Sequence, residues 1–182
     1  MSENLKKWDK YFYDLCNVVA QNSKCFSRKV GAILVKDRTV IGTGYNGAPR
    51  GLPLCNERFL LDAEIQQEAT KWGLSPQKAA KKQVCPRKLL GYKSGEGLEW
   101  CTAGHGERNA LINSARMGIE TKGCTMYMTC EIPCSVCLIE IINSGVLEIV
   151  VTGFGYYDRS SDYLLKNSSL QYRKYSHLEE VK

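Results

Sequence analysis

The chain has 182 residues, of which 43% are hydrophobic and 24% are charged, and it carries a formal net charge of +6 at pH 7. This composition is typical of a globular protein with one hydrophobic core. No run of 18 or more apolar residues is present, so we expect no membrane-spanning helix. Residues 1–10 are polar and charged, unlike a secretory signal, and we therefore expect a cytoplasmic protein.

The positive charge is mild and scattered along the chain. It fits an anionic substrate such as a nucleotide, although an excess of this size is usually a solvated surface. Proteins that bind polynucleotides concentrate basic residues in a stripe with interleaved aromatic residues, and this sequence shows no such stripe. We therefore expect a small-molecule substrate rather than a nucleic acid or a membrane.

Cysteine is unusually frequent, with nine residues in the chain. An odd number argues against a fully paired disulfide framework, and a reducing compartment keeps thiols free. Metal ligation is the favoured interpretation of these cysteines, followed by buried free thiols. Cys16, Cys124 and Cys130 are best interpreted as ordinary core residues.

The first half of the chain begins with an amphipathic pattern. Apolar residues at helical spacing predict a helix over 5–21. Two apolar segments, 30–35 and 39–45, are separated by a short polar link and predict a β-hairpin. Residues 54–100 are polar and irregular, with one helix predicted at 57–72. A stretch of this kind inside a compact domain is usually functional or held by a metal, so we interpret it as an insertion.

The second half alternates helices with strands. A proline at the start of one helix and a glycine after its end mark its limits. The elements expected are a helix at 105–117, a strand at 124–129, a helix at 133–145, a strand at 146–152, a helix at 158–167 and a strand at 170–175. This alternation predicts a three-layer α/β/α sandwich around one mixed five-stranded sheet, formed as a single domain over 1–182.

Three metal-binding side chains stand at the starts of two predicted helices. His105 precedes one helix, and Cys134 and Cys137 lie in the first turn of the next. One imidazole and two thiolates fill three positions of a tetrahedral zinc site and leave the fourth open for water, as catalytic zinc requires. Glu107 follows the histidine by two residues and can face the same pocket without binding the metal. A purely structural zinc knuckle would need a fourth ligand and no adjacent carboxylate.

The spacing H-x-E followed by P-C-x-x-C is the signature of zinc-dependent deaminases. On this signature the chain resembles the cytidine deaminase superfamily and, within it, the deoxycytidylate deaminases. The similarity runs from about Tyr11 to Tyr175. The segments that carry it, in the family's order, are 30–35, 44–51, 105–110, 126–129 and 133–137. The loop Gly-Tyr-Asn-Gly-Ala-Pro at 44–49 is the most diagnostic, because it is typical of the mononucleotide deaminases.

The resemblance implies hydrolysis of the exocyclic amine of dCMP, with Zn²⁺ acidifying a water molecule and Glu107 as the general acid and base. It also implies substrate contacts. Asn46 would hold the sugar, Tyr157 would lie near the base, and Asn109 is a weaker pocket candidate. Arg28 and Arg116 are candidates for the phosphate. As turn, core or surface residues, all five have ordinary structural interpretations as well.

Two departures from the family affect the expected substrate. Gly106 stands where the family normally has alanine, and this could enlarge or loosen the floor of the pocket. The turn 129–133 is one residue longer than usual. The alternatives left open are a deaminase of a modified dCMP, a deaminase of tRNA or single-stranded DNA, and a zinc-stapled binding module.

Four further cysteines lie in or beside irregular chain, namely Cys25, Cys55, Cys85 and Cys101. We expect some or all of them to hold a second, structural zinc, because a long polar insertion buries too little apolar surface to order itself. The alternative is four reduced thiols. The resemblance further implies a homo-oligomer, a hexamer, with dCTP and dTTP as allosteric effectors.

Overall fold

The computed structural model describes residues 3–93 and 95–178 and separates the chain into two compact units. Of the described residues, the larger unit contains 3–23, 30–46 and 105–178. The smaller unit contains residues 24–29 and 47–104. The insertion that we predict at about 54–100 falls within this smaller unit.

The larger unit is built on a five-stranded sheet with strand order β2-β1-β3-β4-β5. β1 pairs antiparallel with β2 and β3, whereas β4 pairs parallel with β3 and β5. The strands are β1 (Gly31–Lys36), β2 (Thr39–Tyr45), β3 (Thr125–Met128), β4 (Glu148–Val151) and β5 (Gln171–Lys174). The predicted mixed five-stranded sheet is confirmed.

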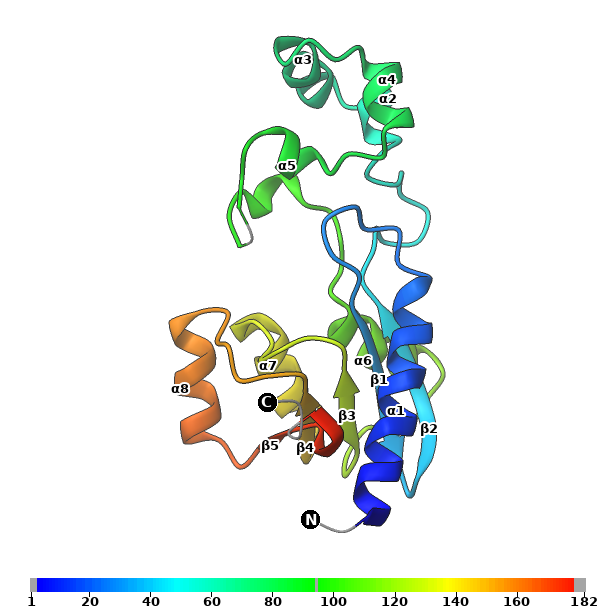
Figure 1. Ribbon diagram of the computed structural model, residues 1–182, viewed down its shortest axis with the longest axis vertical. Helices are drawn as coiled ribbons and strands as arrows, with labels where there is room; N and C mark the ends of the chain where they lie inside the picture. Colours follow the sequence, from blue (N-terminus) through cyan, green and yellow to red (C-terminus); the bar gives the residue numbers. More distant parts are fainter. Residues whose placement is uncertain (1–2, 94, 179–182) are drawn as a thin grey trace. The chain divides into compact units, whose positions relative to one another are not determined.

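Helices cover both faces of this sheet (Figure 1). One face packs against α1 (Glu3–Gln21), with Phe12 and Cys16 buried against Ile33 and Tyr127. The other face packs against α6, α7 and α8, whose buried side chains join the alternate strand residues in a second cluster. The bounds of these helices are Gly106–Arg116, Ser135–Asn143 and Arg159–Asn167. The three-layer α/β/α architecture is therefore confirmed.

The close packing of α6 against β2 depends on glycine. A Cβ atom on Gly44 would overlap the backbone nitrogen of Ala110 and the carbonyl oxygen of Gly106. A Cβ atom on Gly42 would overlap the Ser114 hydroxyl. These two glycines on one face of a strand let the helix lie closer to the sheet than side chains would permit.

The smaller unit is helical and has a small core of its own. Phe59, Ile65, Ala69 and Ala79 are buried, and partly buried residues such as Trp100 pack against them. Its elements are α2 (Arg58–Leu61), α3 (Ala63–Lys71), α4 (Pro76–Lys81), α5 (Pro86–Leu89) and the 3₁₀-helix η1 (Leu98–Trp100).

The prediction of a single helix at 57–72 is wrong in one respect, because the chain forms two helices there, α2 and α3, separated at Asp62. This residue is extended, and its carboxylate accepts a hydrogen bond from the Ile65 amide at 3.4 Å. It therefore acts as the N-cap of α3 and ends α2 before it. Throughout the described part of the chain, no helix is long and apolar enough to span a membrane.

The glycine packing predicts that Gly44→Ala destabilises the larger unit by about 3 kcal/mol or more, because the new methyl group meets rigid backbone rather than a movable side chain. Gly47→Ala is the matched control, since no atom lies within 4 Å of the position its Cβ would take. Its effect should stay within about 0.5 kcal/mol. Thermal and denaturant unfolding of both variants measures the difference. Equal stability of the two variants would contradict the packing account.

Candidate metal centre

The candidate metal centre lies where two helices of the larger unit begin. His105 is the N-cap residue of α6 and Cys134 is the N-cap residue of α7. Cys137 follows in the first turn of α7 and is completely buried. His105 makes no capping hydrogen bond with α6, and both N-cap side chains face the shared group. Unpaired backbone amides at a helix start favour negative charge, which suits thiolate ligands.

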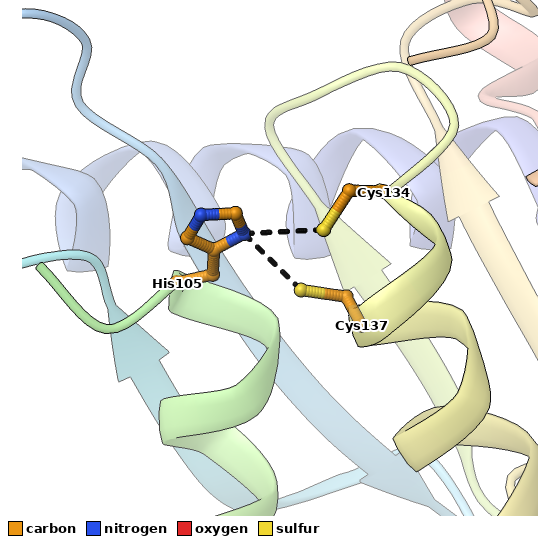
Figure 2. A group of neighbouring side chains, drawn as sticks. All are labelled: His105, Cys134 and Cys137. Carbon is orange, nitrogen blue, oxygen red and sulfur yellow. Dashed lines mark hydrogen bonds between the residues drawn. The ribbon is translucent and has the colours of Figure 1, made fainter. Parts of the chain in front are cut away.

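The three side chains converge on one point (Figure 2). His105 Nδ1 lies 3.2 Å from Cys137 Sγ and 3.5 Å from Cys134 Sγ. A tetrahedral zinc ion with bonds of roughly 2.0–2.3 Å separates nitrogen and sulfur ligands by roughly 3.5 Å. Among the described residues, this is the one group of three or more metal-binding side chains whose ligand atoms all lie within 4.8 Å of one another. The donor set therefore fits zinc in both chemistry and spacing.

The electrostatics of the group also favour a cation. A hydrogen bond from Cys137 lowers the pKa of Cys134 to about 4, against the effect of burial and with a further contribution from His105. The same hydrogen bond to Cys134, together with burial, raises the pKa of Cys137. The hydrogen bond with Cys134 also raises the pKa of His105. The Cys134 thiolate is thus stabilised, and thiolates are the form in which cysteines bind a metal ion.

Glu107 lies in the first turn of α6 and is only 4% exposed. The thiol of Cys130 donates a hydrogen bond to its Oε1 across 3.4 Å. The sequence alone indicates a core role for Cys130, and it is indeed buried, but its contact with Glu107 makes it part of the surroundings of the site. The contact depends on how the turn after β3 lies against α6, so no local sequence pattern predicts that Cys130 lies beside Glu107.

Gly106 does not enlarge the pocket floor, and our expectation on this point is wrong. A Cβ atom at this position would lie 2.9 Å from the carbonyl oxygen of Val30. Because Gly106 has no side chain, the start of α6 can lie directly against the backbone at the start of β1. The space that alanine would fill is therefore taken by backbone and leaves no extra room for a substrate.

Asn46 lies at the end of β2 and is 9% exposed. Its Oδ1 accepts hydrogen bonds from the Val30 amide at 2.8 Å and from the Ser23 hydroxyl at 2.8 Å. The backbone N–H of Asn46 donates a hydrogen bond to the carbonyl oxygen of Val30 at 3.1 Å. These contacts fix the carboxamide orientation, with the oxygen held by the protein and the nitrogen on the opposite side. Ser23 lies 23 residues away, and sequence reasoning does not find it.

The other four predicted substrate residues lie in different parts of the chain. Asn109 donates to the Tyr45 carbonyl at 2.8 Å and so ties α6 to β2. Arg116 is exposed at the last residue of α6, about 15 Å along the helix from its start, so the structure does not bring it to His105. Half-buried Tyr157 lies in the loop between β4 and α8. Arg28 is exposed and belongs to the smaller unit.

All four cysteines of the expected second site belong to the smaller unit. Cys55 and Cys85 are buried, and Cys25 and Cys101 are half-buried. Burial, together with the nearby thiols of Cys25, Cys85 and Cys101, raises the pKa of Cys55 to about 11. The four thiols therefore lie in one neighbourhood, although their sulfur atoms are not gathered within 4.8 Å as in the His105 group.

A mixed sheet with a histidine and two cysteines at the starts of two covering helices defines this chain as an α/β protein with a candidate metal centre of three ligands. Residues 6–153 match the family model described as the cytidine and deoxycytidylate deaminase zinc-binding region. The chain therefore belongs to this family.

Individual relatives agree with the family match. A deoxycytidylate deaminase of Mycobacterium phage D29 is 36% identical over 148 residues, which cover 79% of this chain and 92% of the relative. That of Schizosaccharomyces pombe is 31% identical over 168 residues, which are 92% of this chain but only 44% of the relative. This chain thus spans less than half the length of that protein.

A solved structure supports the fold. The dCMP deaminase of cyanophage S-TIM5, determined in complex with dCMP and dUMP, aligns with a TM-score of 0.62 and 21% identity. The alignment covers 96% of this chain and 98% of that one. At this level of identity the likeness concerns the fold alone.

Proposed function

We propose that the protein is a zinc-dependent deaminase that hydrolyses dCMP to dUMP and ammonia. The observation that carries the proposal is the convergence of His105, Cys134 and Cys137, with the buried carboxylate of Glu107 two residues after His105 in the first turn of α6. Support comes from the relatives in phage D29 and Schizosaccharomyces pombe, both named deoxycytidylate deaminases. The cyanophage structure of similar fold contains both dCMP and dUMP.

His105 Nδ1 and the two thiolates would hold the zinc ion and leave one position for solvent. When bound, zinc supplies a Lewis acid that lowers the pKa of water and so provides a nucleophile at neutral pH. The α7 helix start stabilises the two thiolates.

Glu107 would carry the protons of the reaction. It accepts a proton from water as the water oxygen forms a bond with C4 of cytosine, and it delivers this proton to N3. The second proton of the same water passes through the carboxylate to the amine as the C4–N4 bond breaks, so that one water is consumed and one ammonia leaves. The hydrogen bond from Cys130 holds Oε1 in place, which leaves Oε2 as the mobile acceptor.

Asn46 would bind the sugar with its amide nitrogen, since its oxygen is engaged by Val30 and Ser23. Tyr157 would lie near the base, while Asn109 acts mainly through its bond to the β2 backbone. Phosphate contacts by Arg28 and Arg116 stay predictions. The correction at Gly106 removes one reason to expect a modified base.

We predict that the purified protein releases ammonia from dCMP and turns over deoxycytidine much more slowly, because a mononucleotide site binds the phosphate. The measurement is ammonia release and product analysis on a panel of dCMP, 5-substituted dCMP, deoxycytidine, AMP and single-stranded DNA. Glu107→Gln is the matched control. It should retain the metal while its kcat falls by about a hundred- to ten-thousand-fold. Near wild-type turnover by this variant, or activity only on polynucleotide, would contradict the proposal.

We also propose a second, structural zinc held by Cys25, Cys55, Cys85 and Cys101. The proximity of the four thiols within the smaller unit supports it. So does the small size of that unit's core, since among its described residues only four hydrophobic ones besides cysteines and proline are buried. Four thiolates would close a tetrahedron, as structural zinc sites require.

Protein purified without added zinc should contain two zinc ions per chain. Cys55→Ser should remove one and preserve deamination, whereas Cys137→Ser should remove the other and abolish it. Cys101→Ser, at a half-buried position, repeats the first test in case Cys55→Ser does not fold. Elemental analysis giving one zinc per wild-type chain would exclude the structural site.

The resemblance further supports a homo-oligomer, a hexamer, regulated by dCTP and dTTP. The outer surfaces of α6, of the segment that follows it and of α7 are consistent with burial against a second copy, because Ile112, Ile119 and Ile139 are 46%, 37% and 46% exposed. Between these helices lies a groove of about 380 Å³. Light scattering should give six times the chain mass, and Ile112→Glu should reduce it. A wild-type monomer would contradict the assembly, and rates insensitive to both triphosphates would contradict the regulation.

A further inference from the structure

The N-terminus of α8 holds the backbone on both sides of Cys134. Asp158 Oδ2 accepts a hydrogen bond from the Ser135 amide at 3.0 Å. The hydroxyl of Ser161, which is completely buried, donates to the Pro133 carbonyl at 2.9 Å. The residues immediately before and after Cys134 are therefore both fixed by one neighbouring helix.

The need for this arrangement follows from the position of Cys134 in α7. The first amides of a helix have no partner within the helix, and an N-cap side chain normally supplies one. Cys134 occupies the N-cap position of α7, and its sulfur faces His105. The first amide of α7, that of Ser135, is satisfied by Asp158 from the start of another helix. Its other oxygen, Oδ1, caps α8 itself by accepting from the Ser161 amide at 2.8 Å.

We propose that Asp158 and Ser161 are positioning residues that hold the Cys134 thiolate in its geometry for the metal and thereby slow metal release. This inference rests on the proposed zinc centre. The carboxylate is ionised at neutral pH, because hydrogen bonds from Ser135 and Ser161 lower the pKa of Asp158 although partial burial acts to raise it. Residues that orient metal ligands in this way typically change metal affinity 10- to 100-fold when they are replaced.

A capping role confined to α8 is the competing explanation, and substitution can separate the two. Asp158→Ser keeps a good N-cap for α8, but its single, shorter oxygen cannot also reach Ser135. Ser161→Ala leaves the backbone cap of α8 by Asp158 in place and removes the hydroxyl bonds to Pro133 and to the Asp158 carboxylate. Asp62→Ser is the matched control, because Asp62 caps α3 in the smaller unit and its side chain bonds Ile65 and Arg58 of that same unit.

The experiment follows zinc release from the full-length holoprotein into a colorimetric chelator, well below the melting temperature of each variant. The release phase that is absent in Cys137→Ser belongs to the candidate centre. We expect this phase to be about 10- to 100-fold faster in Asp158→Ser and in Ser161→Ala, and unchanged in Asp62→Ser. Acceleration in both variants without a matching fall in melting temperature supports positioning rather than general stability.

Wild-type release rates in Asp158→Ser and Ser161→Ala would overturn the inference. If Asp158→Ser does not fold, Ser161→Ala decides the result alone. A wild-type protein that lacks the Cys137-dependent phase would instead contradict the zinc centre itself, so the two failures are distinguishable.

Discussion

The approach of α6 to the sheet determines where its first residues lie, and glycine makes that approach possible. Gly42 and Gly44 leave no side chain between β2 and the helix, and Gly106 presses against the Val30 carbonyl where β1 begins. His105 and Glu107 therefore reach the end of the sheet at which β3 leads into the turn of Cys130. A methyl group at any of these glycines would meet backbone or a packed hydroxyl, so the helix start would move and carry the histidine and the carboxylate with it.

The same end of the sheet concentrates positive potential from two helix starts, and the chain uses it for thiolates and a carboxylate instead of conventional caps. His105 and Cys134 take the N-cap positions of α6 and α7, where serine, threonine or aspartate would otherwise be preferred. At α7, Asp158 from the start of α8 satisfies the first amide of the helix, that of Ser135. Ligand geometry and helix stability are thus assigned to different residues, which lets the metal-binding side chains point away from their own helices.

Much of the fold follows from local pattern. The five strands and the amphipathic helices are predicted from apolar periodicity, proline and glycine, and the His105, Glu107 and Cys134–Cys137 spacing indicates the chemistry directly. Local sequence pattern does not predict contacts between residues that are far apart in the chain. The contacts of Ser23 with Asn46 and of Cys130 with Glu107 each join residues 23 positions apart, and the Asp158 contact with Ser135 does the same. The break at Asp62 was missed because one capping aspartate interrupts an otherwise helical pattern.

The central claim is that a three-ligand zinc ion lies between α6 and α7 with its fourth position open. An anomalous difference map, from crystals measured on both sides of the zinc absorption edge, tests this most directly. The account predicts a zinc peak roughly 2.0–2.3 Å from His105 Nδ1 and from the sulfurs of Cys134 and Cys137, with a solvent oxygen as fourth ligand on the side of Glu107. A fourth protein ligand that closes the site, or no zinc between these three side chains, would contradict it.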